Sequence, residues 1–420
     1  MSYWKQVLSD WNEIFREELR TIFKDQGILI FFFVVPLVYP LLYTFIYTNE
    51  VVREVPIAVV DDSRSALSRD FLRHLDASPD VDIISYCANM KEAEQHIKHR
   101  EAYGIIYVPR DFSTRLHRGE QVAIQAYGDM SGMLYYKSIL GSATEVSLKF
   151  NARIKVERGG GTTAEQDKFS EHAIRYEVVS LYNPQNGFAA FLLPGVLILI
   201  IQQTLLLGVG MAAGTKREKN LFHHLLSIKQ HPRGLLRIVC SKSLAYLLAY
   251  IPVSVYVLAV VPRMFQLNQI GNPGTLALFI LPFLIACTFF AMTISGLIKH
   301  REASIVLIVF SSVPLLFISG ISWPGSALPD FWKAVGYAFP STFGINGFVA
   351  INSMGAHLSD VRSEWYFLWL QALVYFLTTC LVYRNSIVSS RKRHEAQLLE
   401  ELALSKAKHE APETQPAQTH

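Results

Sequence analysis

Long apolar runs alternate with polar segments along the chain, and the apolar runs have the length of membrane-spanning helices. A helix needs roughly 20 apolar residues to cross about 30 Å of hydrocarbon. Prolines interrupt several runs, which membranes tolerate because neighbouring helices satisfy the freed backbone groups. The pattern predicts an α-helical polytopic membrane protein with six transmembrane helices, at residues 28–48, 188–213, 239–261, 275–298, 303–321 and 365–383.

Composition agrees with this prediction. Hydrophobic residues make up 51% of the 420 residues and charged residues only 18%. The mean hydropathy is positive, which is unusual for a soluble chain of this length. The one charge inside the six segments is Lys242, near the start of the third. We expect its long side chain to reach back to water at the end of the helix.

Basic residues in the short loops indicate the orientation, because Lys and Arg beside a span tend to stay in the cytoplasm. Loops on the opposite side hold only Arg263, Lys333 and Arg362. We therefore expect both termini in the cytoplasm, with residues 384–420 as a cytoplasmic tail. The basic residues gather after the second, fourth and sixth spans, at Lys216, Arg217, Lys219, Lys229, Arg233, Arg237, Lys299, Arg301, Arg384, Arg391, Lys392 and Arg393.

Residues 49–187, between the first two spans, are long enough for a separate extracytoplasmic domain. Alternation of strand and helix patterns predicts a small α/β fold. Apolar residues then recur at helical spacing from Met133 to Ile154, and glycines at 159–161 interrupt that helix before a second one returns to the membrane. We expect an inserted α/β domain on a helical stalk, with strands at 55–60, 81–86, 103–108 and 122–127 and helices at 65–75 and 90–98.

Residues 1–27 have the pattern of an amphipathic interfacial helix, with an apolar stripe on one side and charged residues on the opposite side. A helix packed on a cytoplasmic partner is the alternative, and the two are compatible. The apolar stripe consists of Trp4, Val7, Leu8, Trp11, Ile14, Phe15, Leu19, Ile22 and Phe23. The opposite face carries Asp10, Glu13, Arg16, Glu17 and Arg20.

The loop at 214–237 combines a charged cluster with a short amphipathic helix, which can dock a cytoplasmic partner. Glu218, flanked by cations, can form charge-assisted hydrogen bonds with a moving protein surface, and the following apolar residues offer a hydrophobic contact. An ordinary positive loop is the alternative. The residues expected to couple the loop to its partner are Lys216, Arg217, Glu218, Lys219, Leu221, Phe222 and Leu225.

The segment at 322–350 is too aromatic for a solvated loop and too interrupted for a span. It suits a re-entrant or interfacial helix at the mouth of a pathway; an interfacial hairpin that caps the bundle is the alternative. Gln202 and Gln203, polar residues within the second span, are pathway candidates, with interhelical hydrogen bonding as the alternative. The remaining pathway or gate candidates are Ser319, Gly320, Trp323, Pro324 and Pro329.

The sequence argues against catalysis by this chain. The spans contain no His, Asp or Glu, which intramembrane hydrolysis would require, and no Gly-x-x-x-x-Gly-Lys-Ser/Thr phosphate loop is present. His96 and His99 have ligand spacing, but charged neighbours favour a solvated helix face, so we expect no metal site. We also expect no cofactor bound by this chain, no nucleic-acid partner, and no intrachain disulfide from Cys87.

Taken together, these features resemble the type-2 ABC exporter permeases, and among them the bacterial drug or multidrug exporters with a large extracytoplasmic domain. The matching features are the interfacial N-terminal helix, the inserted domain, the charged loop from Lys216 to Leu226, and the pattern Ser319, Gly320, Pro324, Pro329 and Pro340. The resemblance covers residues 1–390. The charged loop departs from the common Glu-Arg-Glu-x-Gly-Thr form at Lys216, Lys219 and Asn220.

The resemblance implies a division of labour. Two permease subunits, identical or paralogous, would form one pathway in the inner membrane, and separate nucleotide-binding ATPase subunits with ATP and Mg would dock on the inner loops. Spans two and five would line a pathway for a hydrophobic or amphipathic substrate, whether drug-like, lipid or lipid-linked. Membrane lipid is an expected partner, and contact with a periplasmic adaptor stays open. The rival class is a non-transporting membrane receptor or anchor that presents the outer domain to a ligand.

Overall fold

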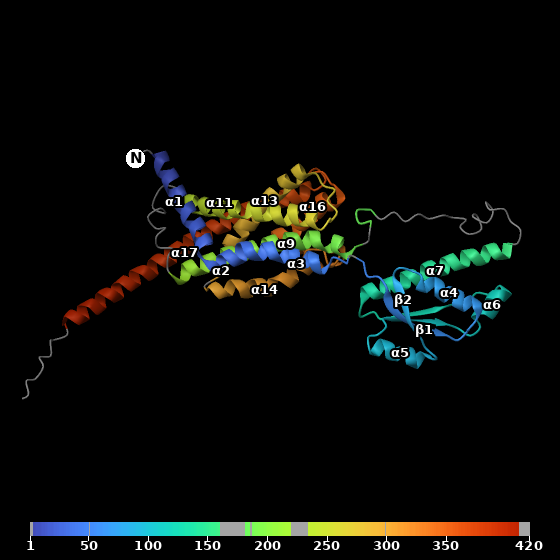
Figure 1. Cartoon of the computed structure of the whole chain (residues 1–420). Coiled ribbons are helices and arrows are strands. Elements are labelled where there is room, and N and C mark those ends of the chain that lie inside the picture. The colour runs from blue at the N-terminus through green and yellow to red at the C-terminus, as the bar shows by residue number, and fades with distance from the viewer. Residues whose placement is uncertain are drawn as a thin grey trace, which may run out of the picture. The chain divides into compact units, whose positions relative to one another are not determined.

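A computed structural model describes residues 3–49, 51–159, 181–184, 187–219, 234–298 and 300–410 (Figure 1). The chain divides into two compact units. One unit is the helical bundle formed by Met1–Thr48 and Leu181–His420, and the other is the inserted domain at Asn49–Ser180. We describe each unit by itself.

Among the described residues of the bundle, six helices are long and apolar enough to cross a membrane, which confirms the predicted polytopic fold. The first span consists of α2 (Gln26–Leu29), η1 (Ile30–Val34) and α3 (Val35–Ile46), and the second is α9 (Phe188–Glu218). The third joins α11 (Gly234–Val255), η3 (Tyr256–Val260) and α12 (Val261–Met264). The others are α13 (Pro273–Ile294), α14 (Arg301–Ile318) and the apolar part of α17 (Arg362–Glu410).

Prolines explain the irregular turns in the first and third spans. The π-helical turns η1 and η3 end two residues before Pro36 and Pro262. Proline has no N–H for the ordinary helical hydrogen bond and its ring crowds the preceding turn, so a wider turn relieves both problems without ending the helix. These two spans therefore stay continuous despite their prolines.

Helix α9 forms the centre of the bundle. Of the residues in its most apolar stretch, 83% are buried, against 17% for α14. It packs along α13, α14 and α16 (Pro340–Met354) and against the first span. Gly208 permits the last contact, because a Cβ there would lie 2.0 Å from the ring of Phe32. The second span is thus apolar on all sides because it is surrounded by protein.

Between the fifth and last spans the chain forms short, broken helices. They are η4 (Gly325–Ala327), α15 (Asp330–Gly336) and α16, and α15 and α16 are bent by 89° at their junction. Pro340 begins α16, where a missing N–H is tolerated. The predicted segment at 322–350 is accordingly a bent helical pair rather than a straight span.

The inserted domain contains a four-stranded sheet in the order β2-β1-β3-β4. β1 (Val55–Asp61) pairs in parallel with β2 (Val81–Tyr86) and β3 (Gly104–Val108), and β3 pairs antiparallel with β4 (Gln125–Gly128). Parallel neighbours need a crossover, which α4 (Ala66–Asp76) and α5 (Met90–Lys98) provide. These bounds agree closely with the predicted α/β pattern, although α6 (Phe112–Arg118) was not expected.

Helices cover both faces of this sheet. Side chains of β1 and β3 pack on one face with Phe71 of α4 and Phe112 of α6. The other face holds Ala58 and Ile105 against Ala93 of α5 and buries Cys87. Helix α7 (Met133–Gly159), expected in a stalk, contributes Ile139, Val146 and Phe150 to the first core. The predicted stalk helix is therefore a layer of the domain; the second stalk helix falls outside the described residues.

Candidate functional site

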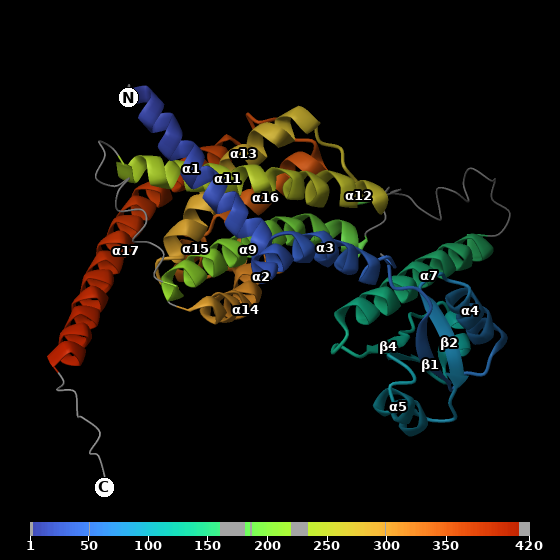
Figure 2. The same cartoon turned by 60° about the vertical axis from the view of Figure 1, so that its left-hand side comes forward.

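The N-terminal helix α1 (Tyr3–Lys24) packs along α11 (Figure 2). Within residues 7–24 the buried positions are Asp10, Ile14, Glu18 and Ile22, spaced four apart. Such a row is one ridge of a helix surface. Asp10, expected on the polar face, is therefore buried, because the packed ridge runs through charged as well as apolar positions.

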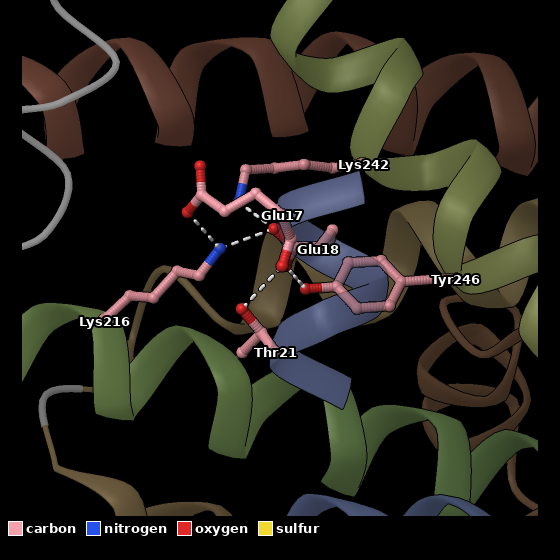
Figure 3. A network of polar contacts seen from close by, with 6 residues as sticks. All are labelled: Glu17, Glu18, Thr21, Lys216, Lys242 and Tyr246. Carbon is pink, nitrogen blue, oxygen red and sulfur yellow. Dashed lines mark hydrogen bonds and ion pairs between the residues drawn. The ribbon is translucent and has the colours of Figure 1, made fainter. Parts of the chain in front are cut away.

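Glu18 is the centre of a buried polar network (Figure 3). Its Oε2 atom lies 2.6 Å from Nζ of Lys216 in α9 and 2.6 Å from Nζ of Lys242 in α11. The hydroxyl of Tyr246 donates to Oε1. Nζ of Lys216 also lies 3.4 Å from Oε1 of Glu17. We call Glu17, Glu18, Lys216, Lys242 and Tyr246 the Glu18 cluster.

The charges of the Glu18 cluster balance, since two glutamates face two lysines. Burial raises the pKa of the Glu18 carboxyl, but the charges of Lys216 and Lys242 and their hydrogen bonds outweigh that effect and hold the pKa well below its ordinary range. Lys242 also lies 5.7 Å from the ring centroid of Tyr383 in α17. Breaking such a buried pair costs about 3–5 kcal/mol because it leaves an uncompensated charge. The cluster therefore joins α1, α9 and α11 tightly.

Two further ion pairs involve Asp10 within α1 and Asp25, the residue that follows it. Arg237 of α11 donates to Asp10 at 2.8 Å. Arg301 of α14 contacts both oxygens of Asp25, at 2.7 and 3.1 Å. Asp25 Oδ1 also accepts from the backbone N–H groups of Gly27 and Ile28 and so caps the start of the first span. Ion pairs thus join helix α1 to α9 and α11, and the residue after it to α14.

The structure divides the predicted coupling residues into two groups. Lys216 and Arg217 face inward, and Arg217 donates to the backbone oxygens of Ser295 and Ile298 and, at 3.0 Å, to Ser386 Oγ. Glu218 accepts from the backbone N–H of Arg301 at 2.9 Å and keeps 38% of its side chain exposed. Lys219 is exposed. Leu221, Phe222 and Leu225 lie outside the described residues.

Gln202 connects α9 to the bent helical pair. Its Oε1 accepts from the backbone N–H of Ser341 at 2.6 Å and from Sγ of Cys287 at 3.8 Å. Ser341 lies in the first turn of α16, where backbone N–H groups have no partner within the helix. Gln202 therefore makes the interhelical hydrogen bond that was the alternative to a pathway role.

Gln203 differs from its neighbour, whose Nε2 also has no partner in the part of the chain that the structure describes but whose Oε1 accepts hydrogen bonds. Its side chain is only 8% exposed, and neither its Oε1 nor its Nε2 has a hydrogen-bond partner among the described residues. Seven residues on, Gly210 lies on the same face of α9, close to Ser304 of α14. Gln203 therefore lies on the face of α9 that packs on α14. Its amide, which has no partner within the described ranges, favours a position for water or for a polar group of a substrate.

The Ser-Gly segment after α14 forms a sharp turn. Ser319 is buried and donates to the backbone oxygen of Leu316 at 2.7 Å, and Gly320 has a φ of 89°, a conformation that favours glycine. Trp323 is 54% exposed. Pro324 and Pro329 precede η4 and α15. These residues shape the turn, and the structure brings none of them to Gln202 or Gln203 by a described hydrogen bond.

Comparison with known families agrees with this architecture. A family model described as ABC-2 family transporter protein matches residues 27–381. The chain belongs to the ABC-2 transporter family. The resemblance to type-2 ABC permeases is confirmed at that level. The linearmycin resistance permease protein LnrN of Bacillus subtilis (strain 168) is 22% identical over 372 residues, which cover 82% of this chain and 91% of the relative. Both findings support a membrane-spanning transporter permease subunit.

The two central residues of the Glu18 cluster, Glu18 and Lys242, were not identified from the sequence. Lys242 was expected to reach water, but it is 2% exposed and paired with Glu18, because a buried carboxylate can compensate its charge in place of water. Glu18 itself was not singled out, and it precedes the residues matched by the family model. The sequence signal for its burial was its position four residues from both Ile14 and Ile22, on the same face of the helix.

Proposed function

We propose that this ABC-2 permease is the membrane-spanning subunit of an ATP-driven exporter in a bacterial cytoplasmic membrane, and that a separate nucleotide-binding subunit hydrolyses ATP. The Glu18 cluster carries this proposal. It joins α1, α9 and α11 at the end of the bundle where α9 leads into the charged loop and α11 begins. A partner that pushes on this loop therefore moves the three helices as one body.

The exposed residues at this end suit the partner contact. Glu218 is held near the start of α14 by Arg301 yet stays partly exposed, and Lys219 is exposed beside it. Lys216 and Arg217 act differently, because their charged groups form contacts within the bundle and hold the end of α9 from which the loop begins. We assign direct contact to Glu218 and Lys219 and a positioning role to Lys216 and Arg217, while Leu221, Phe222 and Leu225 supply the apolar contact.

Basic residues support the orientation. They flank the loop ends at this side of the bundle, which by the positive-inside tendency is cytoplasmic. Both termini then lie in the cytoplasm and the inserted domain outside. Under this topology the Glu18 cluster lies at the membrane face where ATP is available to the partner subunit.

A hydrophobic or amphipathic substrate fits the pathway best. The unsatisfied amide of Gln203 lies in the α9 and α14 region, and the spans offer otherwise apolar surface. The name of the relative LnrN records a permease for linearmycin resistance, which agrees with export of a compound to which a cell needs resistance. A second permease, identical or paralogous, would complete the pathway against α14, whose outward side chains are largely exposed.

Co-purification with an ABC ATPase subunit tests this function. The full chain is expressed with the ATPase encoded beside it, and ATP hydrolysis is measured in lipid for wild type and Glu218→Ala. We expect a stable complex and reduced lipid-stimulated hydrolysis in Glu218→Ala. Glu302→Ala is the matched control, because Glu302 is an exposed acid in the first turn of α14 at the same end. Failure of any ATPase to bind would favour the receptor or anchor alternative.

A further inference from the structure

A lateral slot lies between the third and fourth spans, away from the Glu18 cluster and from Gln203. Its volume is about 670 Å³, within the range of small-molecule sites. Apolar side chains form its walls, among them Ile251, Leu258, Leu276, Ile280 and Leu284. No residue of α1, α9 or α14 lines it. The slot is therefore separate from the proposed coupling site and pathway.

The slot has the depth of one membrane leaflet. Along α13 its lining runs from Pro273 to Leu284, which at 1.5 Å per residue is about 16 Å. Half of a hydrocarbon core of roughly 30 Å is about 15 Å. Val255 and Leu281 line the slot and remain 55% and 42% exposed, so it opens sideways to surrounding lipid. A hydrocarbon chain can therefore enter without passing through the bundle.

One end of the slot is polar and the other is apolar. Arg263, Gln266 and Gln269 line the end at α12, while the deep end is formed by Ile251 and Leu284. Gln269 Nε2 donates to the backbone oxygen of Leu258 at 2.9 Å and contacts Oδ1 of Asn352 at 3.3 Å, which fixes the loop over this end. Arg263 is exposed, and within the described residues its guanidinium has no hydrogen bond or ion pair.

We propose that this slot binds one anionic phospholipid of the outer leaflet, with an acyl chain along the apolar walls and the phosphate on Arg263. Charge complementarity selects the headgroup, because a guanidinium binds phosphate through paired hydrogen bonds. The depth of the slot, about that of one leaflet, favours the acyl chain of a lipid over a compact solute. The lipid wedges the third span against the fourth, and the site acts whether or not an ATPase is docked.

Native mass spectrometry of the full chain in neutral detergent tests the proposal. The protein is titrated with palmitoyl-oleoyl phosphatidylglycerol and, separately, with the matching phosphatidylcholine. Wild type is expected to bind one phosphatidylglycerol with about fivefold higher affinity than phosphatidylcholine. This is the contribution of one basic residue near an anionic lipid surface, about 1 kcal/mol. Arg263→Gln removes the preference, and Ala277→Phe, which fills the slot, reduces binding of both lipids to the level of nonspecific adducts.

Arg362→Gln is the matched control, because Arg362 is an exposed arginine outside the slot, at the start of α17. It should keep the wild-type preference. The proposal is overturned if Arg263→Gln retains the preference, if Arg362→Gln loses it equally, or if Ala277→Phe binds lipid like wild type. Arg263→Gln changes only an exposed side chain, so it reports on the site even where Ala277→Phe fails to fold. None of these outcomes depends on ATP hydrolysis.

Discussion

Oε2 of Glu18 lies 2.6 Å from Nζ of Lys242, although 224 residues separate them in the chain. The contact brings a helix that precedes the first span against the third span. Because the same oxygen also meets Lys216 of the second span, three segments share one carboxylate. A change in any of them is felt by the other two, and the proposed coupling to an ATPase subunit requires such a connection.

Glu18→Gln should destabilise the protein strongly. It removes the negative charge while leaving Lys216 and Lys242 buried, and breaking a buried pair in this way costs about 3–5 kcal/mol. Thermal unfolding in detergent measures the effect. Glu13→Gln is the control, because Glu13 lies on the exposed side of α1 and should change stability by no more than about 0.5 kcal/mol. Equal unfolding temperatures for the two variants would contradict the structural importance of the cluster.

The contribution of Glu18 should be independent of pH near neutrality. Its pKa is held far below the ordinary value of 4.5, so the folded protein keeps the carboxylate charged. The stabilisation is fully present above the unfolded pKa and is lost as pH falls from there through the folded pKa. The difference in stability between wild type and Glu18→Gln should stay constant from about pH 8 to 5 and shrink below about 4.5. A difference that already narrows between pH 7 and 6 would show that the two lysines do not hold the carboxylate charged.

The two neighbouring glutamines should respond in opposite ways to substitution by leucine. Gln202→Leu leaves the backbone N–H of Ser341 without its acceptor and should destabilise by about 1–3 kcal/mol. Gln203→Leu removes a buried amide that has no partner among the described residues, so it should leave stability unchanged or raise it, while lowering transport. Unfolding curves and efflux from vesicles measure both. Similar destabilisation by the two variants would contradict the assignment.

The spans and the α/β insert could be predicted from sequence because their signals are local. A long apolar run without charged residues indicates a helix within lipid, and alternating strand and helix patterns indicate a layered α/β domain. Phe188 begins the second span in both the prediction and the structure, and β2 has the predicted bounds. The packing of α7 on the sheet was not predictable, because helical periodicity shows an apolar face without naming what covers it.

The Glu18 cluster could not be predicted for a related reason. At the positions of Lys242 and Glu18, either water or a buried partner can compensate the charge of the side chain. Spacing along the sequence does not show which residues of different helices come into contact. The charged loop was identified, but its residues were treated as one group. Only packing separates Lys216, whose ammonium is used inside the bundle, from Glu218, which stays partly exposed.

The central claim is that ATP hydrolysis by a partner subunit is coupled to the bundle through the Glu18 cluster. The most direct measurement is lipid-stimulated ATP hydrolysis by the complete transporter, below the unfolding temperature of each variant, for wild type, Glu18→Gln and Glu13→Gln. We predict that Glu18→Gln lowers stimulation at least fivefold, or about 1 kcal/mol of coupling, while Glu13→Gln matches wild type. Equal stimulation in all three proteins would contradict the claim.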